Sequence, residues 1–565
     1  MRVIVGNRSL NLSKNNFVGQ GGEGSIYIKS GIAYKIYTEP QNMIPEGKIH
    51  ELQALTAPEI IRPQEVILSD HKVSIGYTMK ALTNTHPLCK LFTKAFKQRN
   101  GLTSDNILVL VQSMRDTMEH IHKANILVVD ANELNFLVNS AFETVYFIDV
   151  DSYQTKHFPA TAIMDSIRDR HSGDNFSTAT DWFSWGIVTW QLITGIHPYK
   201  GKHPKMKTLD DRMLNNVSVM NPEVKVPSIC PPWADVIPAN YLEWYKAVFE
   251  DGKRIPPPID FVGTITLSAP IVKIVSGTNT FRIVEIDDMG EEIIRTQASS
   301  TWGGRGLVIF SINSLKLHKK RWDVDGRSSH VSEIRACEHP ATVQWNPNRT
   351  LTVSEVFGPA TLDKPLSDIS GVMSYKGQVY TQQEGGLYEM ILRKVGTRLL
   401  CGFELRANVL PKASYMYDGV VIQNILGAWF ATILPEPGIC YTIPLCETKH
   451  HKIIDAKFEN GVLMIIGAKS GAFDKFIYRF GPNYEPHVRI ISDPSSQDIN
   501  FTVTGTGICA HVLEDGKLEL FRNNPNSKDV KVIEDPIIHG DMRLFTDGAG
   551  VKFFQGSKIY SIEMK

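Results

Sequence analysis

The chain has 565 residues, of which 42% are apolar and 21% charged, with 60 basic and 60 acidic side chains. One ordinary domain holds roughly 100–200 residues, so two or more domains are expected, and the apolar content excludes general disorder. The zero net charge gives no long-range attraction to nucleic acid or to an anionic membrane, and neither is expected as a partner.

The first chemical pattern is a glycine-rich segment near the start of the chain. Gly19, Gly21 and Gly24 form G-x-G-x-x-G, with Gly22 inside it and Ile26 two positions beyond it. Glycines let a hairpin backbone approach phosphate groups closely enough for its N–H groups to donate to them. The segment is a candidate phosphate-binding loop.

The residues after this loop favour a hairpin over the strand–loop–helix of a dinucleotide-binding fold. Residues 26–28 and 32–36 are predicted strands, because both are short apolar runs rich in β-branched and aromatic side chains. Ala33 and Lys35 in the second strand match the V-A-I-K pattern, whose lysine pairs with nucleotide phosphates.

A predicted amphipathic helix over residues 103–124 precedes a second group of candidate residues. Asp130 and Asn135 stand five positions apart after this helix and before an apolar strand, as in the catalytic loop H-R-D-L-x-x-x-N. Asp149 follows another apolar strand, which fits the metal-binding Asp of D-F-G. Asp181 then opens an apolar helix, and a polar turn at 251–254 ends this part of the chain.

The pattern changes near residue 255. Pro256, Pro257 and Pro258 cannot continue a helix, and short β-rich runs follow them. We therefore expect one domain over residues 1–260 and a second, all-β domain over 261–565.

The second part contains a repeat. Turn glycines recur at intervals of 42, 42, 44 and 43 residues, at Gly377, Gly419, Gly461, Gly505 and Gly548. This period is the length of one four-stranded propeller blade, and the region predicts a β-propeller of about seven blades, with six or eight open. A tandem of β-sandwiches is the alternative.

The seven cysteines are scattered, and no two form a C-x-x-C pair, which argues against a disulfide framework and against a zinc ribbon. The N-terminus lacks the apolar stretch of a signal peptide, and no apolar run is long enough to span a membrane. A cytoplasmic, reducing location is expected.

Taken together, the ordered motifs make residues 1–260 resemble a protein kinase catalytic domain. The stretch I-D-V-D-S-Y-Q at 148–154 is similar to the I-D-x-D-S-[FY]-Q of an atypical branch of bacterial eukaryotic-like serine/threonine kinases. The resemblance implies a two-lobed α+β fold with ATP in the cleft, so the expected architecture is a two-lobed kinase-like domain followed by an all-β propeller.

The resemblance also implies roles for single residues. Asp130 would accept or orient the substrate hydroxyl, Lys35 would hold the α- and β-phosphates, and Asn132 would bond to the γ-phosphate. Asn135 and Asp149 supply the hard oxygen ligands that Mg²⁺ prefers.

Further residues are assigned to ATP binding. Glu51 is expected to fix Lys35, with Glu46 as the alternative. Asp181 is expected to anchor the backbone of the catalytic loop. The hinge beside adenine is expected over residues 77–82, and the full set of ATP-binding candidates comprises Gly19, Gly21, Gly22, Gly24, Ile26, Ala33, Lys35, Glu51, Met79, Lys80 and Leu82.

Three departures from the kinase pattern qualify this assignment. Val128 and Val129 replace His and Arg of H-R-D, so switching through a phosphate bound to that arginine is not expected. Asn132 stands where a serine/threonine kinase usually has lysine. No A-P-E motif is found, although Arg254 resembles the buried arginine that pairs with its glutamate, and Asp165 or Asp169 could replace that glutamate.

The predicted function is an ATP- and Mg²⁺-dependent serine/threonine-protein kinase, a transferase whose propeller recruits a protein substrate or partner. One alternative is a pseudokinase that binds nucleotide and partner proteins without catalysis. Another is a small-molecule phosphotransferase, which shares D-x-x-x-x-N and a later I-D.

Overall fold

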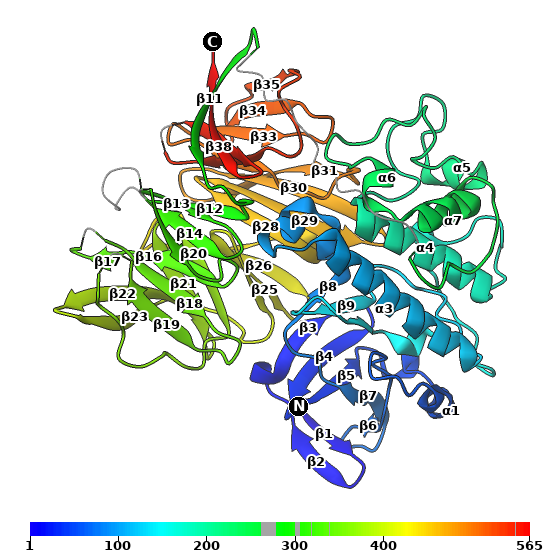
Figure 1. Ribbon diagram of the computed structural model, residues 1–565. Helices are drawn as coiled ribbons and strands as arrows, with labels where there is room; N and C mark the ends of the chain where they lie inside the picture. Colours follow the sequence, from blue (N-terminus) through cyan, green and yellow to red (C-terminus); the bar gives the residue numbers. More distant parts are fainter. Residues whose placement is uncertain (262–277, 300–305, 318, 338, 357, 549) are drawn as a thin grey trace.

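Figure 1 shows the computed structural model of the chain, which describes residues 1–261, 278–299, 306–317, 319–337, 339–356, 358–548 and 550–565. Strands hold 39% of the residues and helices 17%, so the protein is mainly β. Small sheets make up most of it, and nearly all their strand pairs are antiparallel.

The N-terminal residues form one seven-stranded antiparallel sheet in the order β2-β1-β6-β7-β5-β4-β3. The predicted strands over 26–28 and 32–36 are confirmed, because they pair with each other, and the strands on either side of the glycines also pair. The strands are β1 (Arg2–Val5), β2 (Arg8–Asn11), β3 (Phe17–Gln20), β4 (Gly24–Lys29), β5 (Ile32–Tyr37), β6 (Val66–Leu68) and β7 (Ser74–Lys80).

The α-helices of the described residues all lie between 46 and 249. They are α1 (Glu46–Glu51), α2 (Lys94–Arg99), α3 (Ser104–Lys123), α4 (Thr178–Thr194), α5 (Leu209–Leu214), α6 (Trp233–Val236) and α7 (Ala239–Phe249). Short 3₁₀ turns are η1 (Lys14–Asn16), η2 (Pro40–Asn42), η3 (Leu52–Ala54), η4 (Leu88–Phe92), η5 (Val150–Ser152), η6 (Asp165–Ile167) and η7 (Cys446–Thr448). A three-stranded sheet, β8 (Thr85–Pro87), β9 (Phe136–Asn139) and β10 (Val145–Phe147), lies among them in the order β10-β9-β8.

The two longest helices begin at side chains that satisfy free backbone N–H groups. Thr103 accepts from the Asn106 N–H at the start of α3, which confirms the helix predicted over 103–124. Ser177 accepts in the same way from Thr180 at the start of α4. Gly195 ends α4 with a φ of 82°, the left-handed conformation that glycine adopts without strain.

The predicted fold class, a two-lobed α+β kinase-like domain followed by a β-propeller of about seven blades, is wrong. Strand content exceeds helix content more than twofold, and the described residues contain seven mostly short α-helices that do not build a helical lobe. Between α4 and α7 the chain carries seven prolines, at 198, 204, 222, 227, 231, 232 and 238, and only two helices of six residues or fewer. Proline removes a backbone donor and interrupts helices, which explains the irregular connections.

The β-rich part is a series of small sheets of three to five strands rather than a uniform set of four-stranded blades. The first strand described after residue 277 pairs with the last strand of the chain. That sheet contains β11 (Phe281–Asp288), β36 (Arg543–Thr546), β37 (Val551–Gln555) and β38 (Lys558–Met564).

The remaining sheets follow in chain order. The second contains β12 (Arg295–Ser299), β13 (Gly306–Phe310), β14 (Ser314–Leu317) and β15 (Lys320–Asp323), and the third β16 (Ser329–Ser332), β18 (Ala341–Trp345) and β19 (Leu351–Glu355). The fourth contains β17 (Ile334–Arg335), β20 (Gly371–Tyr375), β21 (Gln378–Gln383), β22 (Gly386–Val395) and β23 (Arg398–Asn408).

Three four-stranded sheets complete the series. The first contains β24 (Ser414–Tyr417), β25 (Val420–Ile425), β26 (Ala428–Ile433) and β27 (Tyr441–Pro444). The next contains β28 (Lys452–Glu459), β29 (Val462–Lys469), β30 (Ala472–Phe480) and β31 (Pro486–Ile491). The last contains β32 (Phe501–Val503), β33 (Ile508–Val512), β34 (Leu518–Arg522) and β35 (Val530–Ile533).

Four of the five glycines in the predicted repeat occupy hairpin turns with left-handed backbones. The φ angles are 80° at Gly377, 73° at Gly419, 82° at Gly461 and 94° at Gly548. In the remaining turn the left-handed glycine is Gly507 rather than the predicted Gly505. The sequence repeat therefore marks the hairpins even though it does not fix the architecture.

The helical and β-rich parts share one hydrophobic core. Ile454, Ile466, Ala468 and Phe473, from β28 to β30, are buried in the same cluster as the apolar faces of α3, α4 and α7. Figure 1 shows these strands beside the helices. The two sides of the predicted domain boundary at 260/261 therefore pack together through this core.

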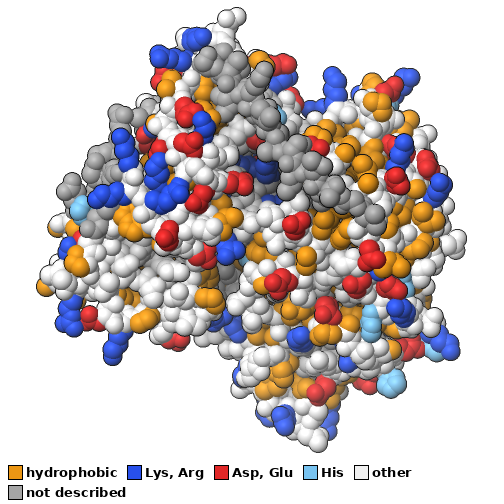
Figure 2. All heavy atoms as spheres, viewed as in Figure 1, with side chains coloured by type: hydrophobic (Ala, Val, Ile, Leu, Met, Phe, Trp, Pro, Cys, Tyr) orange, Lys and Arg blue, Asp and Glu red, His pale blue; other side chains and the backbone are white. Residues whose placement is uncertain are grey.

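On the face shown in Figure 2, basic and acidic side chains are interspersed. All seven cysteines are unpaired. Within the described ranges, no helix combines the length and the apolar character needed to cross a bilayer.

Candidate active site

Lys35 lies at the centre of a charged cluster built from three separate parts of the chain. Its ammonium Nζ is 2.6 Å from Asp151 Oδ2, 3.2 Å from Asp149 Oδ1 and 3.3 Å from Glu23 Oε2. Strand β5 supplies Lys35, the glycine loop supplies Glu23, and the turn after β10 supplies both aspartates. The Tyr37 hydroxyl donates to Asp151 at 2.6 Å and completes the cluster.

The pKa values of the two aspartates shift in opposite directions. Burial opposes the charge of Asp151, but Lys35 and the Tyr37 hydroxyl outweigh it and lower the pKa of Asp151. Burial and the adjacent Asp151 carboxylate raise the pKa of Asp149. Burial likewise disfavours the charge of Lys35, yet Tyr77, Asp151 and Asp149 together raise its pKa. Asp151 is therefore the fixed counter-ion of Lys35, and Asp149 is the carboxylate free to change partner.

The same carboxylates fit a divalent cation. One oxygen each of Glu23, Asp149 and Asp151 lies within 4.8 Å of the others. Carboxylate oxygens are the hard ligands that Mg²⁺ prefers, and nucleotide-bound Mg²⁺ takes only one or two of them. Because Asp151 is committed to Lys35, Asp149 and the exposed Glu23 are the carboxylates available to a metal.

One face of the N-terminal sheet gathers the residues predicted to surround adenine. Ile26 pairs with Lys35 across β4 and β5, and Ala33 pairs with Met79 across β5 and β7. Residues two apart on a strand share a face, so Ile26, Ala33, Lys35 and Met79 all lie on one side of the sheet. Lys80 ends β7 and Leu82 follows it in an irregular segment, where the hinge was predicted.

The glycines of the loop have two different environments. A Cβ atom at Gly19, Gly21 or Gly22 would meet nothing within 4 Å, whereas a Cβ at Gly24 would lie 2.3 Å from the Ile36 carbonyl oxygen. Gly24 is therefore required by the packing of β4 against β5. The other glycines face open space, which leaves their backbone free to approach a ligand.

Asp130 lies in the loop before β9, and each of its carboxylate oxygens accepts a hydrogen bond. The Met164 N–H donates to Oδ1 at 2.9 Å, and the Asn132 side-chain amide donates to Oδ2 at 2.8 Å. The Asn135 amide donates to the Asp130 backbone oxygen at 3.0 Å, which leaves Asn135 Oδ1 as the atom for a cation. Burial raises the pKa of Asp130 despite these donors.

Asn132, predicted to bond to the γ-phosphate, forms its hydrogen bonds within the loop. Its side chain is only 2% exposed, and Oδ1 accepts from the Leu134 N–H at 2.8 Å while Nδ2 donates to Asp130. Both ends of the amide are used inside the loop. In this structure Asn132 therefore positions Asp130.

Asp181 anchors this loop, as predicted. Its carboxylate is fully buried and accepts from the Val128 N–H at 2.9 Å and from the Val129 N–H at 2.8 Å. His122 Nε2 lies 2.9 Å from the same carboxylate. Val129 has a φ of 61°, which is strained for a β-branched residue and costs of the order of 1–3 kcal/mol. The Asp181 hydrogen bonds hold that conformation.

A backbone hydrogen bond also places Asp149 beside the Asp130 loop. The Ile148 N–H donates to the Asn135 carbonyl at 3.0 Å, which joins the end of the Asp130 loop to the residue before Asp149. Asp149 itself has a φ of 61°. Lys35, Asp130, Asn135 and Asp149 thus belong to one connected site.

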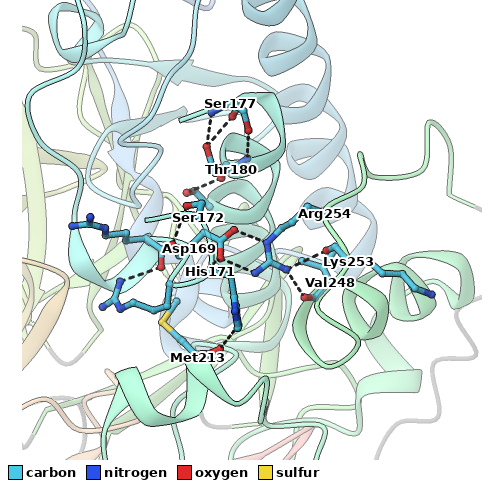
Figure 3. Close-up of polar contacts among 12 residues, drawn as sticks. Asp169, His171, Ser172, Ser177, Thr180, Met213, Val248, Lys253 and Arg254 are labelled. Carbon is cyan, nitrogen blue, oxygen red and sulfur yellow. Dashed lines mark hydrogen bonds and ion pairs between the residues drawn. The ribbon is translucent and has the colours of Figure 1, made fainter. Parts of the chain in front are cut away.

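Arg254 pairs with Asp169, one of the two partners proposed for it. Arg254 Nη2 donates to Oδ1 at 2.7 Å, and Nε donates to Oδ2, so that the pair is bidentate (Figure 3). Asp169 is 2% exposed at its side chain, and the guanidinium stacks 4.4 Å from the Phe183 ring. Asp165, the other candidate, begins the 3₁₀ turn η6.

The predicted partner of Lys35 is wrong. Glu51 pairs with His157 instead, and the Glu46 alternative is not among the groups bonded to Lys35. Helix α1 ends at Glu51, where a 3₁₀ turn begins, and the Glu51 carboxylate accepts from the His157 N–H at 3.4 Å. Asp151 takes the expected role.

Sequence reasoning also missed Glu23 and Lys48. Lys48 is a 6% exposed lysine on α1, and burial lowers its pKa against the opposing effects of Asp151, Asp149 and Glu23. The second Asp of the quoted I-D-V-D stretch was a usable signal for Asp151. Nothing in the spacing of Glu23 or Lys48 marked them.

Comparison of the sequence with models of known protein families and with curated proteins finds no match.

Proposed function

We propose that this protein is an ATP- and Mg²⁺-dependent phosphotransferase that transfers the γ-phosphate to a serine or threonine hydroxyl of a protein. The observation that carries the proposal is the meeting of Lys35 with Asp149, 114 residues away, at 3.2 Å. The Asp130 loop is joined to the same site through Ile148 and Asn135. A cation, metal-binding oxygens and a candidate hydroxyl-orienting carboxylate are together what phosphoryl transfer requires.

The roles follow from the chemistry of each group. Transfer of a phosphoryl group depends mainly on positioning and on neutralisation of charge. Lys35 would pair with phosphate oxygens, and its bond to Asp151 would hold its Nζ in place. Asn135 and Asp149 would hold Mg²⁺, with Glu23 beside them; the bound ion would neutralise phosphate charge.

Asp130 would orient the acceptor hydroxyl and take its proton. A carboxylate with a raised pKa is a better proton acceptor than an ordinary aspartate. Asn132 and the Asp181-anchored backbone support this group by fixing the position of the loop. Recruitment of a protein substrate by residues 261–565 remains part of the proposal, and its support is the contact of Lys452 Nζ with the Leu134 carbonyl at 3.3 Å, beside the Asp130 loop.

The test is phosphate transfer from γ-labelled ATP in the presence of Mg²⁺. Wild-type protein would be compared with Asp130→Ala, Asp149→Asn and Lys35→Met, using dephosphorylated casein and the protein itself as acceptors. Asp529→Asn, which changes an exposed aspartate near β35, is the matched control. Labelling by the wild type and the control but not by the three site variants is the expected result. Labelling that survives Asp130→Ala and Asp149→Asn would overturn the proposal.

A second candidate function is nucleotide binding without transfer. The observation that favours it is the engagement of both Asp130 oxygens by Met164 and Asn132 within the chain. The two functions differ in one measurement. ATP that raises the melting temperature without any transfer would select the binding function.

A further inference from the structure

The segment between η5 and Asp169 lies across the carboxylate that the proposed function assigns to the acceptor. Met164 donates its N–H to Asp130 Oδ1 at 2.9 Å, the oxygen that Asn132 leaves free. The Met164 N–H takes one lone-pair position of this oxygen, and an acceptor hydroxyl would have to approach it beside the segment. In this conformation the segment competes with an acceptor.

Both ends of the segment are fixed. At its start, Gln154 and Leu127 exchange backbone hydrogen bonds of 2.9 and 3.0 Å. Near its end, the Ser184 hydroxyl donates to the Ile167 carbonyl at 3.0 Å, and His197 Nε2 lies 2.8 Å from the Ser166 carbonyl. Met164 lies between these two anchors.

The turn of the β29–β30 hairpin packs directly on this part of the segment. A Cβ at Gly471 would lie 2.3 Å from Ser166 Oγ and 3.1 Å from Met164 Cγ. Ser166 Oγ is buried and has no hydrogen-bond partner among the described residues. The contact is therefore close steric packing of a β-rich hairpin on the residues that flank the Met164 N–H.

The turn end of the hairpin is tied to the helical part. Lys200 forms an ion pair with Asp493, and Asp493 accepts from the Phe473 N–H at 3.2 Å. Phe473, in β30, is 1% exposed in the core cluster that also contains Ile167. The Lys200 Nζ lies 6.0 Å from the Phe473 ring centroid. The hairpin is consequently held by both an ion pair and buried apolar contacts.

The β-rich part also contacts the glycine-loop side of the site. Lys412 Nζ donates to the Ile28 carbonyl in β4 at 2.6 Å, and a Cβ at Gly427 would lie 3.7 Å from the Gln20 side chain in β3. The same series of sheets therefore contacts both the N-terminal hairpin and the segment over Asp130.

We propose that the β29–β30 hairpin is an autoinhibitory clamp, which holds Met164 over Asp130 and keeps the acceptor side of the site closed. This inference rests on the proposed phosphotransferase function. Loosening the hairpin would free the segment, release Asp130 Oδ1 and raise the rate of transfer without any change in the nucleotide-binding residues.

The experiment uses two full-length variants that loosen the clamp from opposite sides. Gly471→Ala inserts a methyl group against Ser166, and Lys200→Gln removes the ion pair with Asp493. Gly556→Ala is the matched control for the first, because Gly556 also has a positive φ, 57°, but a Cβ there meets nothing within 4 Å. Thermal melting establishes that each variant is folded.

Two quantities are measured on all four proteins: hydrogen–deuterium exchange of the peptide that contains Met164, and transfer from γ-labelled ATP to dephosphorylated casein. The expected result for Gly471→Ala and Lys200→Gln is faster exchange together with about tenfold faster transfer, as for a closed state depopulated by a factor of that size. Gly556→Ala should match the wild type in both.

Three outcomes would overturn the clamp. Exchange that stays slow in both variants would mean that the hairpin does not hold the segment. Faster exchange with wild-type transfer rates would mean that the segment does not limit the reaction, and the phosphotransferase proposal would stand without the clamp. Absence of transfer from all four proteins would remove the proposed function and the clamp with it.

Discussion

Lys35 donates a 2.6 Å hydrogen bond to Asp151, and the two side chains are 9% and 4% exposed. Lys35 lies on a strand of the N-terminal sheet and Asp151 lies 116 residues further along the chain. A buried pair of this kind is costly to break from one side, because the remaining charge stays buried without its partner. The pair therefore joins the sheet to the turn that carries Asp149.

Asp151→Asn is expected to lower the free energy of unfolding by about 3 kcal/mol, near the low end for a broken buried pair, because Asp149 and Glu23 remain near Lys35. Glu51→Gln, at the residue that the sequence pattern assigned to this role, is expected to leave the free energy of unfolding nearly unchanged, since its pair with His157 is at the surface. Urea unfolding measures both. Equal losses in the two variants would contradict the assignment of Asp151 as the partner of Lys35.

The glycine loop allows packing to be separated from ligand binding. Gly24→Ala is expected to destabilise the protein by about 1–3 kcal/mol, because its Cβ would lie 2.3 Å from the Ile36 carbonyl oxygen. Gly22→Ala meets nothing within 4 Å and is expected to leave the melting temperature unchanged while weakening ATP binding severalfold. Calorimetric titration with Mg-ATP provides the second measurement, and unchanged ATP affinity in Gly22→Ala would argue against phosphate binding by this loop.

Patterns that act over a few residues predicted the structure well. The glycine hairpin between β3 and β4 and helix α3 are both set by local composition, by strand-forming runs in one case and a 3.6-residue apolar period in the other. The anchor role of Asp181 came from the order of the kinase-like motifs, and its hydrogen bonds to Val128 and Val129 agree with it. Four of the five predicted hairpin glycines of the β-rich part have left-handed backbones, because each stands in a short turn sequence between strand-forming runs.

The errors concern contacts set by three-dimensional geometry. Glu51 contacts His157, 106 residues further along the chain, and no local pattern encodes a contact of that kind. Asp151 reaches Lys35 because the chain turns at Asp149, with a φ of 61° that no spacing rule encodes. The predicted fold class is wrong for a similar reason. A repeat of turns is compatible with several arrangements of small sheets, and the order of motifs does not determine helix content.

Mg²⁺ binding is expected to weaken as the pH falls. Burial and Asp151 raise the pKa of Asp149, so this carboxylate takes up a proton at a higher pH than an ordinary aspartate and then no longer binds a cation. Titration with Mn²⁺ as a spectroscopic probe, between pH 5 and pH 8, should show affinity that falls toward the acid end. Asp149→Asn should bind the ion weakly across the whole range. An affinity in the wild type that does not vary with pH would exclude Asp149 as a ligand.

Glu133 gives the protein a second pH dependence, in its stability. It is 3% exposed in the loop that carries Asp130, and burial raises its pKa to about 7 from 4.5. The folded state therefore binds this proton more tightly than the unfolded state. The proton on Glu133 stabilises the folded state by about 3 kcal/mol below about pH 4.5. This contribution falls as the pH rises toward 7 and is lost above it.

Glu133→Gln keeps the shape of the side chain and removes its titration. At pH 8 the free energy of unfolding of the variant, measured with urea, is expected to exceed that of the wild type by up to about 3 kcal/mol. At pH 4.5 the two free energies should differ little. Glu143→Gln, at an exposed glutamate in the turn between β9 and β10, is the control and should follow the wild type at every pH. A difference between Glu133→Gln and the wild type that is constant with pH would show that Glu133 is charged in the folded protein, held so by its neighbours Lys200 and Lys452.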